Sequence, residues 1–184
     1  IQEGKTGYTP SPGIPQLRQA VATEIGRLRG LEFSAEDVVV AAGAKPFIGY
    51  AVSCVTDYGE GHEVIFPNPG FPIYESQIRS GGAVPVPLYL REGRSFAFDP
   101  EDLASKITDK TRLLILNTPQ NPTGGILTGD DLAAIAEILR KHPDIWIYSD
   151  EIYSRLVYDG TFRSIANEEG MLERTIIADG VSKT

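Results

Sequence analysis

Four kinds of reactive or polar side chain occur in order along this chain, each shortly after an apolar run. Asn121 lies in Asn-Thr-Pro-Gln-Asn-Pro-Thr-Gly (117–124). Asp150 and Tyr153 lie in Ser-Asp-Glu-Ile-Tyr (149–153), and Lys183 lies in Gly-Val-Ser-Lys-Thr (180–184). Together they supply an amide, a carboxylate, a phenol and a primary amine, which can hold an aromatic aldehyde cofactor and tune its ring.

The elements that must position these groups alternate between strand-like apolar runs and helical patterns. The strand candidates are residues 38–42, 63–66, 83–88, 112–116, 145–148 and 175–178. The helix candidates are residues 16–28, 44–55, 73–80, 100–107 and 130–141, with Pro100 in a first turn and Gly30 and Gly81 near helix ends. This alternation predicts an α/β fold, a three-layer sandwich with a largely parallel (mixed) central sheet. Ligands of such sheets bind beyond the carboxyl ends of the strands, where the segments above fall.

The turn formed by Gly43, Ala44 and Lys45 is a candidate phosphate site. The backbone N–H groups of residues 44 and 45 would face outward at the positive end of a helix dipole, and Gly43 permits close approach. A plain strand-to-helix turn is the alternative, and this segment alone favours it, because one glycine is common there and no Walker motif is present.

From about residue 8 to its end, the chain resembles the large domain of class I/II (fold-type I) aminotransferases of the aspartate aminotransferase type. The resemblance is carried by the turn at 43–47, the segments 63–74 and 117–124, and the segments around Asp150 and Lys183. It implies that residues 1–184 are the large domain, in part, and that this domain binds pyridoxal 5'-phosphate (PLP).

The resemblance assigns the phosphate to the 43–45 turn and the pyridine ring to Phe71, which would stack on it. Taken alone, Phe71 is more often a core residue. Asn121 matches the residue whose amide donates to the cofactor's phenolate oxygen, against the alternative of a plain Asn-Pro turn. The resemblance also implies that the 68–69 and 121–122 peptide bonds are cis.

The resemblance assigns the central chemical roles to Asp150, Tyr153 and Lys183. Asp150 follows an apolar strand, and its natural partner is the protonated pyridine nitrogen, which it keeps cationic. The alternative is a helix cap near residue 151. Tyr153 matches a second donor to the phenolate oxygen. Lys183 matches the covalent anchor, whose amine also moves the substrate's proton, although a lysine near a chain end is otherwise a solvated charge.

Tyr8 matches a tyrosine that reaches across a dimer interface to the neighbour's cofactor phosphate, and local packing is its equal alternative on sequence alone. The working unit implied is a homodimer. Gly180 departs from the pattern, because many aspartate aminotransferases carry a phosphate-binding serine at this place.

Composition limits the partners. A net charge of −8 without a basic stripe argues against nucleic acid, and no run reaches membrane-spanning length. Cys54 is the only cysteine, so no internal disulfide is possible. We expect a buried, inert thiol and a cytoplasmic protein. No metal is assigned.

These observations predict an aminotransferase that moves an amino group between an amino acid and a 2-oxo acid by a ping-pong mechanism. The alternatives are a PLP-dependent lyase or synthase of the same fold, and a non-catalytic PLP-binding sensor or dimerisation module. In the family, the arginine that binds the substrate carboxylate follows these residues. We therefore expect residues 1–184 alone to show little turnover.

Overall fold

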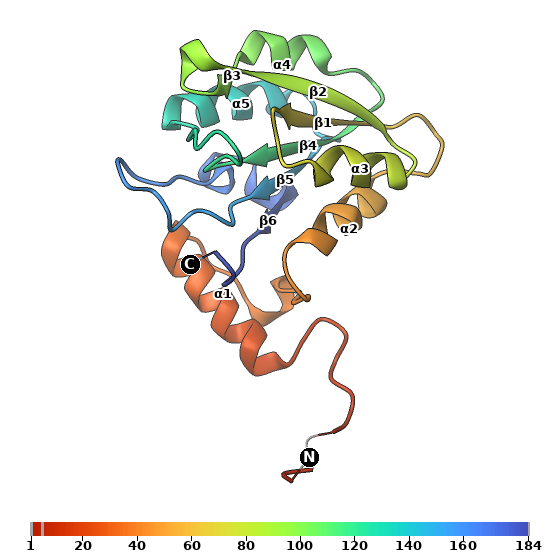
Figure 1. Cartoon of the computed structure of the whole chain (residues 1–184), viewed down its shortest axis with the longest axis vertical. Coiled ribbons are helices and arrows are strands. Elements are labelled where there is room, and N and C mark those ends of the chain that lie inside the picture. Colours follow the sequence, from red (N-terminus) through yellow and green to blue (C-terminus); the bar gives the residue numbers. More distant parts are fainter. Residues whose placement is uncertain (1, 5, 184) are drawn as a thin grey trace. The chain divides into compact units, whose positions relative to one another are not determined.

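The computed structural model describes residues 2–4 and 6–183, and it contains two compact units, Ile1–Ala42 and Gly43–Thr184 (Figure 1). The first unit holds helix α1 (Pro15–Arg29) and the short helix η1 (Ala35–Asp37). Pro15 occupies the first turn of α1, and Gly30 ends the helix in the left-handed conformation at φ 65°.

The predicted strand at residues 38–42 is wrong. Val38 has an extended backbone, but no strand pairs with residues 38–42 in the described part of the chain. The N–H of Val40 donates instead to the carbonyl of Pro12, and Val39 is 58% exposed. An apolar run becomes a strand only where a neighbouring strand accepts its hydrogen bonds.

The second unit is built on one sheet with the strand order β3-β2-β1-β4-β5-β6. The strands are β1 (Glu63–Asn68), β2 (Val84–Arg91), β3 (Ala97–Phe98), β4 (Thr111–Asn117), β5 (Trp146–Asp150) and β6 (Thr175–Ala178). Every pairing is parallel except the one between β2 and β3. The predicted α/β class and mixed sheet are confirmed.

Two helices cover each face of this sheet (Figure 1). Helices α2 (Lys45–Val55) and α3 (Ile73–Ser80) pack on one face, and α4 (Pro100–Lys106) and α5 (Gly129–Arg140) on the other. Strand β4 shows the reason for this layering: Leu113 and Ile115 join the core under α2 and α3, whereas Leu114 and Leu116 join the core under α4 and α5. A strand that is apolar on both faces must be covered on both.

Cys54 is exposed, which corrects the prediction of a buried thiol. The buried residues of α2 are Ile48, Ala51 and Val52, and Cys54 lies two residues beyond Val52, on the opposite side of the helix. Over the described residues, no helix combines the length and the apolar character needed to cross a membrane.

Candidate functional site

The site lies where the chain reverses its direction of travel across the sheet. Strand β1 is flanked by β2 and β4, so the chain moves outward to β3 on one side and then returns to build β4, β5 and β6 on the other. The loops after the parallel strands meet at such a switch point, at their carboxyl ends. Here these loops begin at Asn68, Asn117, Asp150 and Ala178.

Asp150 ends β5 and is the buried carboxyl group of the candidate site. Its carboxyl oxygen Oδ2 accepts a hydrogen bond of 2.6 Å from the hydroxyl of Tyr74, on α3. The backbone N–H of Ile152 donates to Oδ1 at 3.4 Å. Asp150 is 7% exposed and Tyr74 is fully buried, so this pair is shielded from water.

Burial raises the pKa of Asp150, and the hydrogen bonds from Tyr74 and Ile152 oppose that rise. The nearby carboxyl group of Asp179 adds to the rise. Burial likewise raises the pKa of Tyr74 and of Tyr148, whose ring lies on the same face of the sheet. A carboxylate in this environment is stabilised by a cationic partner.

Asn117, the last residue of β4, connects Asp150 to the next loop. Its amide nitrogen Nδ2 donates to the carbonyl oxygen of Asp150 at 3.0 Å, and its oxygen Oδ1 accepts from the backbone N–H of Asn121 at 2.8 Å. The side chain of Asn121 in turn donates to the hydroxyl of Tyr153 at 3.3 Å. Both Asn121 and Tyr153 are partly exposed, and their polar ends converge.

Gln120 attaches the same loop to the loop after β1. Its Nε2 donates to the carbonyl of Pro69 at 2.8 Å, and its Oε1 accepts from the N–H and the hydroxyl of Thr123. The 68–69 and 121–122 peptide bonds are cis, as predicted, and so is the 118–119 bond.

Phe71 and Lys45 extend this set of contacts to the start of α2. The ring of Phe71 meets that of Tyr74 edge to face at 5.8 Å between centroids. The Nζ atom of Lys45 lies 5.8 Å from the centroid of the Phe71 ring, within cation–π range.

The amino end of α2 is open to an anion. Ala44 occupies the N-cap position without a side-chain cap. Gly43 has a φ of 87°, and a Cβ there would meet no atom within 4 Å. Backbone N–H groups at such a helix start can bind a phosphate.

Contacts thus link Lys45, Phe71, Tyr74, Asp150, Asn117, Asn121 and Tyr153 within the second unit. Lys183 is not among these linked residues. It lies in a turn after β6, and its side chain is exposed. Gly180 approaches Ile152 so closely that a Cβ would lie 3.0 Å from the Cδ1 atom of Ile152. Tyr8 belongs to the first unit, where it is fully exposed.

Sequence reasoning gave no role to Tyr74, Asn117 or Gln120. Each is a polar residue whose partner lies on another segment, so the contact depends on the tertiary fold. One signal was available: each lies within four residues of a predicted site residue, in a segment that carries the family resemblance.

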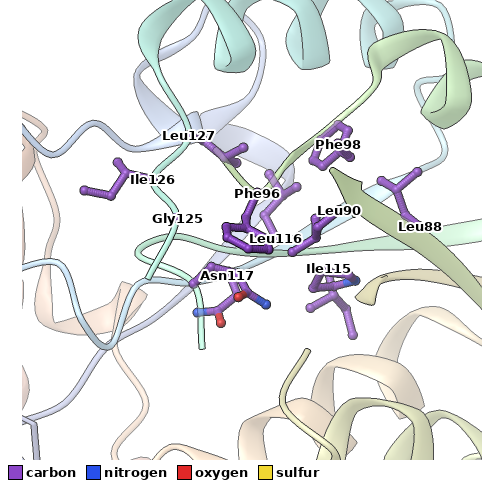
Figure 2. Close-up of a pocket in the computed structure, with 12 residues that line it drawn as sticks. Leu88, Leu90, Phe96, Phe98, Ile115, Leu116, Asn117, Gly125, Ile126 and Leu127 are labelled. Carbon is purple, nitrogen blue, oxygen red and sulfur yellow. The ribbon is translucent and has the colours of Figure 1, made fainter. Parts of the chain in front are cut away.

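An apolar pocket lies beside the loop after β4 (Figure 2). It has about 340 Å³ of empty space, part of it open solvent, and side chains such as Leu90, Phe98 and Leu116 line it. Asn117 stands at its edge in Figure 2. Asn117 and Gln120 line this pocket and so border both it and the polar site, whereas Asp150, Asn121 and Tyr153 do not line it.

Comparison with known proteins gives the family. The family model "Aminotransferase class I and II" matches residues 1–184, and the chain belongs to that family. The chain is 40% identical to a bifunctional aspartate aminotransferase and glutamate/aspartate-prephenate aminotransferase of Petunia hybrida, with all of this chain and 38% of that protein covered. It is 37% identical to an aspartate aminotransferase of Bacillus subtilis, with all of this chain and 47% of the relative covered.

Comparison with solved structures gives the same class of protein. The aromatic aminotransferase of Pyrococcus horikoshii matches with a TM-score of 0.93 at 36% identity, covering 99% of this chain and 48% of the other. The aspartate aminotransferase of Thermus thermophilus with maleate matches with a TM-score of 0.91 at 34% identity, covering 99% and 46%. The chain therefore spans less than half the length of these relatives.

The donor set fits PLP. A cationic ring N–H suits the buried carboxylate of Asp150, whose pKa is raised by burial. Asn121 and Tyr153 present polar groups that can donate to a ring oxygen, and the uncapped start of α2 suits a phosphate.

Proposed function

We propose that this chain is the PLP-binding part of an aminotransferase that exchanges an amino group between an amino acid and a 2-oxo acid. The observation that carries the proposal is the buried Asp150 carboxylate, bonded by Tyr74 and joined through Asn117 to the converging Asn121 and Tyr153. Membership of the class I and II family supports it.

When bound, PLP supplies an aldehyde that takes up an amino group and a cationic ring that withdraws electrons. The carboxylate of Asp150 would hold the proton on the ring nitrogen, and Tyr74 keeps that carboxylate oriented. Phe71 would stack on the ring and shield it from water. Asn121 and Tyr153 would donate to the ring oxygen.

The remaining residues would bind the phosphate of PLP and form its covalent attachment. The backbone of Gly43, Ala44 and Lys45 would bind the phosphate, and Lys45 would add positive charge. The Nζ atom of Lys183 would be the point of covalent attachment, and as a free amine it would accept the proton from the substrate's alpha carbon and become an ammonium group.

We further propose a homodimer in which Tyr8 binds the phosphate in the neighbouring subunit's site. The full exposure of the Tyr8 side chain supports a contact with the neighbouring subunit. The proposed substrates are amino acids and 2-oxo acids, and relatives named for aspartate, prephenate and aromatic amino acids make those the first to test. A cytoplasmic location remains our prediction.

A half-reaction separates this function from its alternatives. The protein as expressed from its natural gene is loaded with PLP and mixed with one amino acid at a time, starting with aspartate, glutamate and phenylalanine. An aminotransferase releases at most one equivalent of 2-oxo acid per bound PLP and no ammonia, and turnover resumes when a second 2-oxo acid is added.

Two other outcomes would contradict the proposal. Release of ammonia, or of product beyond one equivalent without a second substrate, indicates a lyase. PLP binding without release of oxo acid from any member of a broad panel indicates a sensor or dimerisation module.

A further inference from the structure

We propose that Asn117 is a positioning residue, whose side-chain amide sets the place of Asn121 relative to Asp150. The proposal rests on the proposed function, in which Asn121 and Asp150 contact opposite parts of one cofactor ring. It concerns a residue that does not itself touch the cofactor.

The sheet fixes one end of this connection. Asn117 and Asp150 are register partners at the carboxyl ends of β4 and β5. The Nδ2 atom of Asn117 donates to the carbonyl oxygens of Asp150 at 3.0 Å and of Pro119 at 3.2 Å. These two bonds use both amide hydrogens, so the orientation of the side chain is determined.

The other end is the loop itself. The Oδ1 atom of Asn117 accepts the backbone N–H of Asn121 at 2.8 Å. Asn117 is 5% exposed, so bulk water does not compete for these bonds in the intact protein. An amide of this length provides two donors and an acceptor in one plane. Alanine and serine cannot span both partners.

The direction of the Asn121 side chain follows from this contact. With its backbone held by Asn117, Asn121 points its amide at the hydroxyl of Tyr153. Without Asn117, the loop stays attached by the bond from Thr118 N–H to the carbonyl of Asp150 and by the bond from Gln120 to Pro69. We therefore expect Asn117→Ala to fold with a displaced Asn121.

The test uses the protein expressed from its natural gene, loaded with PLP, and follows the pH at which the bound cofactor's absorbance changes. A donor to the ring oxygen lowers that pH. Asn117→Ala should raise the midpoint in the same direction as Asn121→Ala, by about one pH unit, as expected for the loss of one hydrogen bond to a charged oxygen. The double variant should shift no further than Asn121→Ala alone.

A second readout needs no cofactor. Hydrogen exchange at the Asn121 amide should be faster in Asn117→Ala, because the N–H has lost its acceptor. Thr111→Val is the matched control: Thr111 is buried at the opposite end of β4 and bonds to Glu63. It should lower stability without changing the absorbance midpoint or the Asn121 exchange. If Asn117→Ala does not fold, Asn117→Ser takes its place.

The outcomes separate the two claims. If the unmodified protein binds no PLP, the proposed function fails, and the role of Asn117 fails with it. If the protein binds PLP but Asn117→Ala leaves the midpoint unchanged, or shifts it only as Thr111→Val does, the positioning role alone is overturned.

Discussion

Replacing Tyr74 by phenylalanine should destabilise the cofactor-free protein in a way that depends on pH. The change removes one hydroxyl and keeps the ring, so the edge-to-face contact with Phe71 remains and no large cavity opens. The lost bond is the 2.6 Å contact to Asp150, a length typical of a hydroxyl that donates to a charged oxygen. Such bonds contribute about 1.5–3 kcal/mol, and we expect a loss of that size above the folded-state pKa of Asp150.

The sign of the pH dependence follows from the carboxyl group. Burial raises the folded-state pKa of Asp150, so its contribution to stability is present below the unfolded pKa and is lost as the pH rises through the folded pKa. The hydrogen bond from Tyr74 reduces that loss of stability, because it stabilises the ionised form of Asp150. Removing the hydroxyl raises the pKa of Asp150 further, so the destabilisation should be larger at pH 8 than below pH 4, where about 1 kcal/mol of a neutral hydrogen bond is lost.

Tyr148→Phe is the matched control. Tyr148 is also a buried tyrosine on the same face of the sheet, but its hydroxyl has no hydrogen-bond partner among the described residues. Its removal should leave stability unchanged or raise it by up to about 1 kcal/mol. Urea unfolding followed by the fluorescence of Trp146, the single tryptophan, measures both variants. Equal losses in the two variants, or a Tyr74→Phe loss independent of pH, would refute the reasoning.

Two smaller changes test local structure. Thr128→Ala removes the capping box that Thr128 forms with Asp131 at the start of α5, and urea unfolding should show a loss of about 1 kcal/mol; no measurable loss would mean that the cap is not formed. Gly43→Ala places a side chain at a φ of 87° and should cost about 1–2 kcal/mol from backbone conformation alone. Gly93→Ala, which has equal open space without a positive φ, should not. Equal effects of the two glycine changes would argue against strain at Gly43.

The sequence was sufficient for most of the sheet and helices, because continuous apolar runs marked the buried strands and period-3.6 patterns marked the helices. The two-residue strand β3 was missed, since Ala97 and Phe98 are too few to carry a pattern. The strand at 38–42 was predicted wrongly, because apolar composition does not reveal whether a partner strand exists. Cys54 was a correctable error: the helical spacing of Ile48, Ala51 and Val52 already places it on the other side.

For the candidate site too, some residues could be predicted from the sequence and others could not. Asn121, Asp150 and Tyr153 could be proposed as site residues from motif order, and their mutual arrangement follows from parallel strands that end at one edge of the sheet. Tyr74 and Asn117 could not be assigned roles, because their partners are 76 and 33 residues away along the chain. Such contacts are set by the packing of α3 and by the strand register, which local patterns do not specify.

The central claim is that Lys183 anchors PLP in the site formed by these loops. Borohydride reduction of the PLP-loaded protein, followed by peptide mass mapping, reports the attached lysine directly. We predict the pyridoxyl group on Lys183, its loss in Lys183→Ala and its retention in Lys45→Ala. Label on Lys45, or label spread over several lysines, would contradict the account.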